Sequence, residues 1–145
     1  MTVHPIDHAG LEILPFAACL RLLASVPVGR VGFLADGEIV ILPVNHLMDG
    51  PDVIFRTGSG SKLCSVDGKN LIGFEADHYD AMTRSGWSVV ISGFTEVVES
   101  DAEIDRFERL GLQSWGGDAA RDPHWIRIRP TSITGRRTPG AAFCV

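Results

Sequence analysis

The residues best suited to bind a ligand lie in one short stretch of the chain. Phe55-Arg56-Thr57 ends an apolar run, and the glycine- and serine-rich loop that follows is closed by Lys62. Glycine-rich backbone exposes N–H groups, and such groups bind phosphate together with hydroxyls and nearby cations. The stretch therefore predicts a phosphate site between Arg56 and Lys62. Two plainer interpretations stay open, in which Arg56 forms a surface ion pair and Ser61-Lys62 only begins a helix.

The sequence contains none of the common motifs for nucleophilic, metal-dependent or dinucleotide-dependent catalysis. It shows no Ser-His-Asp arrangement, no HExxH pair of metal-binding histidines and no GxGxxG dinucleotide fingerprint. Cys19, Cys64 and Cys144 are odd in number and widely spaced, which argues against a disulfide framework and a cysteine-based zinc site. We therefore expect no metal site, a reducing cytoplasm as the compartment and, if the protein is an enzyme, a cofactor that carries the reaction.

Composition narrows the class of protein. The chain has 145 residues, 45% of them hydrophobic, and a formal net charge of -5, which favours one soluble globular domain with a real core. The sequence contains no stripe of basic residues, so nucleic-acid binding is not expected. No apolar run approaches the roughly 20 residues that span a bilayer, and the first residues lack the features of a signal peptide. We expect a single domain over 1–145, with irregular tails at 1–10 and 138–145.

Hydrophobic periodicity and turn residues predict a mainly β (α+β) fold. The expected class is a six-stranded antiparallel split β-barrel with short flanking helices. Helices are expected at 15–25 and from Ser100, where Ser100 and Glu103 form a capping box. Strands are expected at 30–34, 38–45, 53–57, 71–76, 86–99 and 124–130.

Several local features follow from the same patterns. Asp36-Gly37 predicts a hairpin, and Gly93 predicts a bulge. The continuous apolar run in 38–45 predicts a strand buried on both faces or at a barrel closure, and 77–85 is expected to be an exposed connection. In the last strand, Trp125, Arg127 and Arg129 are expected on one face and Ile126 and Ile128 on the other. The buried face of the first helix is expected to comprise Phe16, Cys19, Leu20 and Leu23.

Several short motifs, in this order and spacing, resemble one known family. The motifs are Pro43-Val44-Asn45, Phe55-Arg56-Thr57-Gly58, Ser61-Lys62-Leu63, Gly73-Phe74-Glu75-Ala76-Asp77, Gly86-Trp87-Ser88-Val89-Val90, Ile91-Ser92-Gly93, Trp125-Ile126-Arg127-Ile128 and Thr134-Gly135-Arg136-Arg137. Together they resemble the small bacterial branch of the pyridoxamine 5'-phosphate oxidase-like family of flavin-binding split barrels, and the resemblance covers roughly Leu11 to Arg137.

The resemblance implies a cofactor, FMN, and a set of residues that bind it. Its phosphate would be held by Arg56, Thr57, Ser61 and Lys62, with Phe55 and Leu63 in the same motifs. The edge of the flavin ring would meet the backbone of Pro43, Val44 and Asn45, and His46 beside it is either a substrate contact or a structural residue. Trp87, Ser88 and Arg136 would reach the flavin across the interface of a homodimer.

The resemblance also implies an activity, that of a homodimeric flavin oxidoreductase which transfers hydride to a small acceptor. True pyridoxamine phosphate oxidases are longer and carry further basic and tyrosine residues for the substrate's own phosphate. This chain has only one tyrosine, Tyr79, so oxidation of vitamin B6 is not expected. Two alternatives remain open: a barrel that binds deazaflavin or haem, and a flavin carrier or sensor without catalysis.

Overall fold

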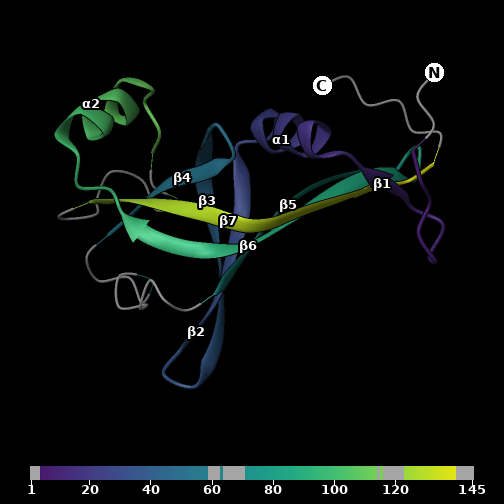
Figure 1. Ribbon diagram of the computed structural model, residues 1–145, viewed down its shortest axis with the longest axis horizontal. Coiled ribbons are helices and arrows are strands. Elements are labelled where there is room, and N and C mark those ends of the chain that lie inside the picture. The colour runs from purple at the N-terminus through teal and green to yellow at the C-terminus, as the bar shows by residue number, and fades with distance from the viewer. Residues whose placement is uncertain (1–3, 59–62, 64–70, 114, 116–122, 140–145) are drawn as a thin grey trace.

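The fold is a closed antiparallel barrel with two helices on its outside (Figure 1). The structure is a computed structural model, and it describes residues 4–58, 63, 71–113, 115 and 123–139. The elements are β1 (Glu12–Leu14), α1 (Phe16–Ser25), β2 (Val28–Ala35), β3 (Glu38–Asp49), β4 (Asp52–Thr57), β5 (Ile72–Asp80), β6 (Ser85–Val97), α2 (Asp101–Arg109) and β7 (His124–Arg137).

Six strands form the barrel in the order β7-β4-β3-β2-β5-β6, and pairing between β6 and β7 closes the ring. β7 is long enough to pair with β4 through its first half and with β6 along most of its length. Closure leaves none of the six strands as a free edge, which removes the usual liability of an antiparallel sheet. The predicted six-stranded split barrel is confirmed, and β1 is a short additional strand on the end of β7.

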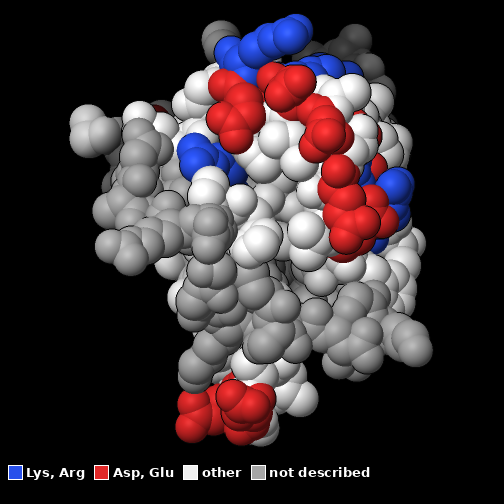
Figure 2. Space-filling model, turned by 90° about the vertical axis from the view of Figure 1, so that its left-hand side faces the viewer, with Lys and Arg blue, Asp and Glu red and all other residues white. Residues whose placement is uncertain are grey.

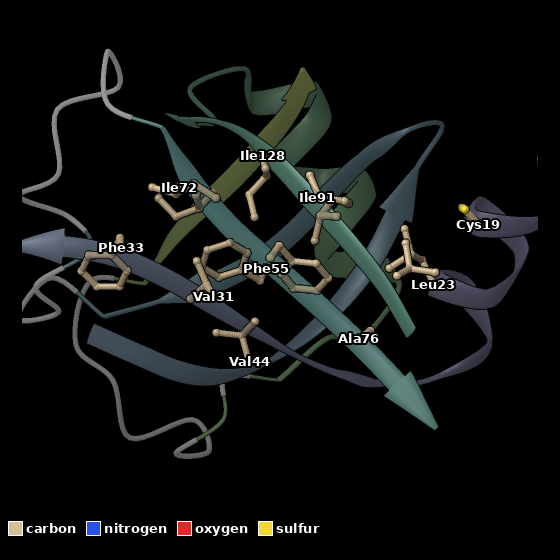
Figure 3. Packing of buried hydrophobic residues seen from close by; sticks show 14 of the residues in the cluster. Cys19, Leu23, Val31, Phe33, Val44, Phe55, Ile72, Ala76, Ile91 and Ile128 are labelled. Carbon is tan, nitrogen blue, oxygen red and sulfur yellow. The ribbon is translucent and has the colours of Figure 1, made fainter. Parts of the chain in front are cut away.

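The barrel interior is filled by the inward-facing apolar side chains of all six strands. Phe55 and Ile91 lie near its centre (Figure 3), and both are almost completely buried, as is Phe74 of the same cluster. α1 closes one end with Cys19, Leu22 and Leu23. Cys19 is therefore a core residue as predicted, whereas Phe16 was wrongly assigned to the buried face: it is 56% exposed, because the helix begins there and its first turn extends beyond the barrel.

The predicted hairpin and bulge are both confirmed. Asp36 and Gly37 have positive φ values of 51° and 77°, as the central residues of a type I′ turn require. The β6–β7 register shifts between Ser92 and Gly93. A Cβ atom at Gly93 would collide with the carbonyl of Arg129, so only glycine fits at this bulge.

Three other predictions about the strands and caps were wrong. β5 extends to Asp80, so most of the expected connection at 77–85 is a β-hairpin with β6, and only residues 81–84 turn. β3 is not buried on both faces, since Ile39 and Ile41 are exposed on the outside of the single chain. Ser100 caps α2 as predicted, but Glu103 does not reach back to it and pairs with Arg127 instead.

Candidate functional site

Six of the twelve residues predicted to bind phosphate and flavin lie on the neighbouring strands β3 and β4. The described ladder between these strands ends at the pair His46↔Phe55, so Asn45 lies just before it and Arg56 just after it. The side chains of Asn45, Arg56 and Thr57 are all partly exposed. Ser61 and Lys62, which were predicted to complete the phosphate site, lie outside the described residues.

The backbone of Pro43, Val44 and Asn45 lies at an opening between strands. These residues pair with Arg30, Gly29 and Val28 of β2, whereas among the described residues their ladder with β4 has already ended at His46. Main-chain groups of an antiparallel strand point alternately to its two neighbours. The side facing β4 is therefore where the strands separate, and it is the backbone edge on which the flavin ring was predicted to lie.

Arg56 is held from two directions. Its Nη1 donates to the carbonyl oxygen of Leu112 at 3.3 Å, and its guanidinium carbon lies 5.5 Å from the centroid of the Trp125 ring. Asn45 makes a similar contact, since its Nδ2 donates to the carbonyl oxygen of Gln113 at 3.2 Å. The segment after α2 therefore contacts both predicted ligand residues, a relation that the sequence analysis did not foresee.

Three predicted site residues point into the barrel. The side chains of Val44, Phe55 and Leu63 belong to the main hydrophobic core. Their side chains therefore pack beneath the site and do not face a ligand. His46 is also buried: its Nε2 lies 2.8 Å from the Leu23 carbonyl oxygen, and desolvation lowers its pKa, so this geometry fits a neutral, structural ring.

Trp87, Ser88 and Arg136 form a second group at another part of the barrel. They are brought together by the β6–β7 ladder, in which Ser88 pairs with Arg136 and Trp87 with Arg137. They line a pocket of about 200 Å³ that also includes His78 and Tyr79 of β5 and, among the described residues, no residue of β3 or β4. The backbone N–H of Leu11 donates to Asp7 at 3.0 Å and is the main cause that holds the pKa of that carboxyl below its ordinary value; Arg136, which donates at 2.9 Å, adds to it.

An acidic pair lies in a groove on the outer face of β2, β3, β5 and β6. The groove has a volume of about 420 Å³ and is lined by Arg30, Gly32, Ile41, Gly73, Phe74, Glu75, Asp77 and Val90. Burial, together with the neighbouring Asp77 carboxyl, raises the pKa of Glu75 to about 7. No local sequence pattern marks these two carboxyls, because only the strand register places them beside apolar side chains.

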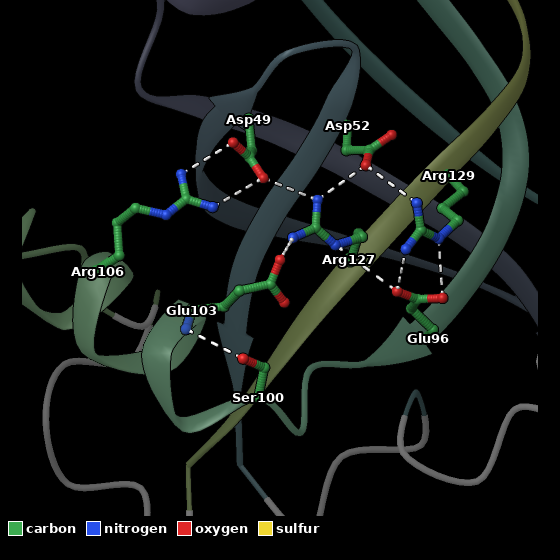
Figure 4. A network of polar contacts seen from close by, with 8 residues as sticks. All are labelled: Asp49, Asp52, Glu96, Ser100, Glu103, Arg106, Arg127 and Arg129. Atoms are coloured by element: carbon green, nitrogen blue, oxygen red, sulfur yellow. Dashed lines mark hydrogen bonds and ion pairs between the residues drawn. The ribbon is translucent and has the colours of Figure 1, made fainter.

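A cluster of ion pairs fixes α2 to the barrel. Arg127 is 3% exposed and donates to Asp49, Asp52 and Glu103 at 2.8–2.9 Å (Figure 4). Arg106 of α2 adds a bidentate pair with Asp49 at 2.9 and 3.1 Å. Charged side chains of both signs accordingly gather on this side of the molecule (Figure 2). The sequence placed Arg127 on the face opposite Ile126 and Ile128, which is correct, but did not predict its burial.

The fold, the β3–β4 site residues and the group of Trp87, Ser88 and Arg136 define the class of protein. It is an antiparallel split barrel with the cationic residues Arg56 and Arg136 near the ends of β4 and β7. Residues 16–137 match the protein family described as pyridoxamine 5'-phosphate oxidase. The chain belongs to this family. Among the described residues, no helix is long and apolar enough to cross a membrane.

Proteins of actinobacteria are similar over most of the chain. The uncharacterised protein Rv0080 of Mycobacterium tuberculosis is 37% identical over 123 residues, which cover 81% of this chain and 79% of that protein. The solved structure of the FAD binding protein from Mycobacterium smegmatis is 37% identical, covers 87% of this chain and 98% of its own, and superposes with a TM-score of 0.73. A structure from Corynebacterium glutamicum is 30% identical, covers 92% and 96% of the two chains, and also gives a TM-score of 0.73.

Proposed function

We propose that the protein is a homodimeric flavin oxidoreductase that binds FMN and transfers hydride to a small acceptor. The observation that carries the proposal is the position of Asn45 and Arg56 on adjacent strands, at the point where the β3–β4 ladder ends. Family membership and the 37% identical FAD binding protein support a flavin as the cofactor. A bound flavin would supply the hydride chemistry, for which the described side chains offer no substitute.

The described residues fit such a cofactor in two respects. The separated backbone edge at Pro43 to Asn45 offers hydrogen-bonding groups to the edge of a planar ring, and the cationic Arg56 directly precedes the glycine- and serine-rich loop. Arg56 and Lys62 would grip the phosphate through charge-assisted hydrogen bonds, which are the strong kind. Ser88, Arg136 and the backbone of Trp87 would reach the ring from the second copy of the chain, since the Trp87 side chain is only 5% exposed and belongs to the main hydrophobic core.

FAD is the second candidate cofactor, because the relative from Mycobacterium smegmatis binds it. The deciding measurement is the absorption spectrum and mass of the small molecule released when the purified protein is denatured. FMN is expected. The mass of FAD would change the cofactor within the same proposal, and a deazaflavin or haem spectrum would contradict it. Oxidation of a reduced nicotinamide at a catalytic rate would separate an oxidoreductase from a flavin carrier.

The phosphate clamp gives a sharper prediction. Losing a hydrogen bond to a charged group typically costs about 1.5–3 kcal/mol, which corresponds to roughly a 10- to 100-fold loss of affinity. Arg56→Ala and Lys62→Ala should weaken FMN binding by this factor in a fluorescence titration. Riboflavin lacks the phosphate, so wild type and both variants should bind it about equally.

Arg21→Ala is the matched control for the clamp. Arg21 is an exposed arginine on α1, so its replacement removes the same charge without touching the site and should leave FMN affinity within about twofold. Unchanged FMN affinity in both Arg56→Ala and Lys62→Ala would remove the clamp. Equal losses for FMN and riboflavin would mean that the two side chains support the fold and not the phosphate.

A further inference from the structure

We propose that Trp125, Glu108 and the backbone carbonyl of Leu112 form a platform that positions Arg56 for an anionic ligand. This inference rests on the proposed function, because the anion in question is the flavin phosphate. It assigns a positioning role to residues on α2 and β7, which lie far from Arg56 in the sequence. We call these three groups the Trp125 platform.

The strand register places Arg56 against the ring of Trp125. The two residues are directly paired across β4 and β7, and both side chains lie on the outer face of the barrel, since the neighbouring Phe55 and Ile126 point into the core. A guanidinium 5.5 Å from a tryptophan centroid is within cation–π range. The Leu112 carbonyl, 3.3 Å from Nη1, then fixes the rotation of the guanidinium plane.

Trp125 is itself held in one orientation. Its indole Nε1 donates to the Glu108 carboxylate at 3.2 Å, and its ring packs against Phe107 with the two centroids 5.6 Å apart. Only 3% of the residue is exposed. A ring that is buried on one side and tied by its single donor presents a fixed surface to Arg56.

The Trp125 platform is held rigidly because α2 is firmly attached to the barrel. Arg106 of the helix pairs with Asp49 on β3, and Arg127 of β7 pairs with both Asp49 and Glu103 of the helix (Figure 4). The buried Phe107 of the helix packs with Ile54 of β4. Glu108 lies in the last turn of this helix, and Leu112 follows three residues after its end. A single docked element therefore supplies both the tether of Trp125 and the acceptor for Arg56.

The physical effect of the platform is preorganisation. A long arginine side chain loses much rotamer freedom when it grips a ligand, and a chain that is already ordered in the free protein loses less. A moderately exposed cation–π contact is worth about 0.5–1 kcal/mol, or roughly 2- to 5-fold in affinity. Loss of the hydrogen bond that orients the ring adds to this, so we expect a total effect of about 3- to 10-fold on FMN affinity.

The first test is a titration of FMN and riboflavin into Trp125→Phe and Glu108→Ala. FMN affinity should fall about 3- to 10-fold in both variants, whereas riboflavin affinity should stay within about twofold. Asp105→Ala, which removes another exposed carboxylate from the same helix, is the matched control. Glu108→Gln keeps an oxygen that accepts the indole N–H, so its FMN affinity should lie closer to wild type than that of Glu108→Ala. Equal losses for the two flavins would make the role structural and overturn the inference.

A double-mutant cycle tests whether the platform acts through Arg56. In an Arg56→Ala background, Trp125→Phe should cause no further loss of FMN affinity. Full additivity of the two losses would overturn the inference, because it would mean that Trp125 supports the ligand independently of Arg56.

A last measurement works without any flavin. The order parameter of the Arg56 Nε–H bond, measured by ¹⁵N relaxation in flavin-free protein, should be high in wild type and fall in Trp125→Phe and Glu108→Ala, but not in Asp105→Ala. Unchanged order in the first two variants would overturn the platform, even if FMN binds. A wild-type protein that binds no flavin, but whose Arg56 loses order in those variants, would contradict the proposed function and leave the platform in place.

Discussion

Arg56 and Arg127 lie on neighbouring barrel strands, and their surroundings suit them to different roles. Arg127 is surrounded by the carboxylates of Asp49, Asp52 and Glu103, so its charge is matched within the protein. Beside Arg56, the Leu112 carbonyl and the Trp125 ring are uncharged groups that hold its guanidinium in one orientation. The first arrangement attaches a helix, and the second orients a side chain where the β3–β4 ladder ends.

Glu75 is the titrating residue that the structure singles out. Its pKa is raised to about 7, first by burial in the outer groove and then by the Asp77 carboxyl, while Arg30 opposes the rise. A carboxyl whose folded-state pKa lies above its unfolded value binds its proton more tightly in the folded state. Its contribution to stability is therefore fully present below about pH 4.5 and is lost as the pH rises through about 7.

The prediction for Glu75 compares wild type with Glu75→Gln, whose amide cannot titrate. The Tm of wild type relative to the variant should fall from pH 5 through pH 7 and level off only above about pH 8. Other groups titrate in both proteins and cancel in this difference. Parallel Tm curves from pH 5 to pH 8 would show that the pKa of Glu75 is not raised.

At the scale of elements, α2 depends on a buried charge rather than on a large apolar face. Phe107 is its only fully buried side chain among the described residues, and the rest of the attachment comes from Arg106, Arg127 and their carboxylates. The Arg106 contact also holds the pKa of Asp49 down at about 2. Removing Arg127 would leave several carboxylates close together with no buried cation between them.

Arg127→Met should therefore destabilise the protein strongly. Breaking a buried ion pair on one side typically costs about 3–5 kcal/mol, which lowers Tm by roughly 6–20 °C in a chain of this size. Arg129→Ala is the control, because the Arg129 side chain is 59% exposed and a surface ion pair contributes about 0–1 kcal/mol. Thermal denaturation of both variants measures the difference, and equal shifts in Tm would contradict the role given to Arg127.

The elements themselves were largely predictable from local patterns. Alternating side chains in 124–130, the Asp36-Gly37 turn and the Ser100 cap each depend on residues close together in the sequence, and all three are found in the structure. The predictions that were wrong depend on contacts between residues far apart in the sequence. Glu103 satisfies the capping-box pattern, but Arg127 binds it more favourably, and the choice between the two partners depends on how α2 packs against β7.

The candidate site was predictable only in part, for the same reason. The motifs around Pro43 and Arg56 identified two strands that do lie side by side. No local pattern joins Arg56 to Trp125 or to Leu112, because these contacts arise from closure of the barrel and from the position of α2. The phosphate-binding role predicted for Ser61 and Lys62 rests on the family resemblance, and the Lys62→Ala titration tests it.

At the scale of the whole molecule, one outer face of the barrel is unusually apolar. Leu34, Ile39, Ile41 and Val90 are between 45% and 79% exposed, and the strand register places them on the same side of β2, β3 and β6. The β2–β3 hairpin, which carries three of them, projects away from the helices (Figure 1). Exposed apolar patches of this kind mark interaction surfaces.

Two glycines on this face fit a close approach by another chain. Gly32 and Gly73 are paired across β2 and β5 and line the groove between Ile41 and Val90. The nearest atoms to a Cβ built at either position lie 3.9 Å away, an ordinary van der Waals distance. The chain's own packing therefore does not require glycine there, whereas a second copy seated in the groove would use the space.

The final prediction is that this face forms the homodimer on which flavin binding depends. Ile41→Asp places a charge in the centre of the apolar face, so it should convert a dimeric wild type into a monomer in light scattering at micromolar concentration. FMN and riboflavin should then both bind at least about 10-fold more weakly, because the β6–β7 residues Trp87, Ser88 and Arg136 of the second copy no longer complete the proposed site. Met82→Asp is the control, since Met82 is 94% exposed in the β5–β6 turn. A wild type that is monomeric with FMN bound would overturn the shared site, and an Ile41→Asp dimer would exclude this face as the interface.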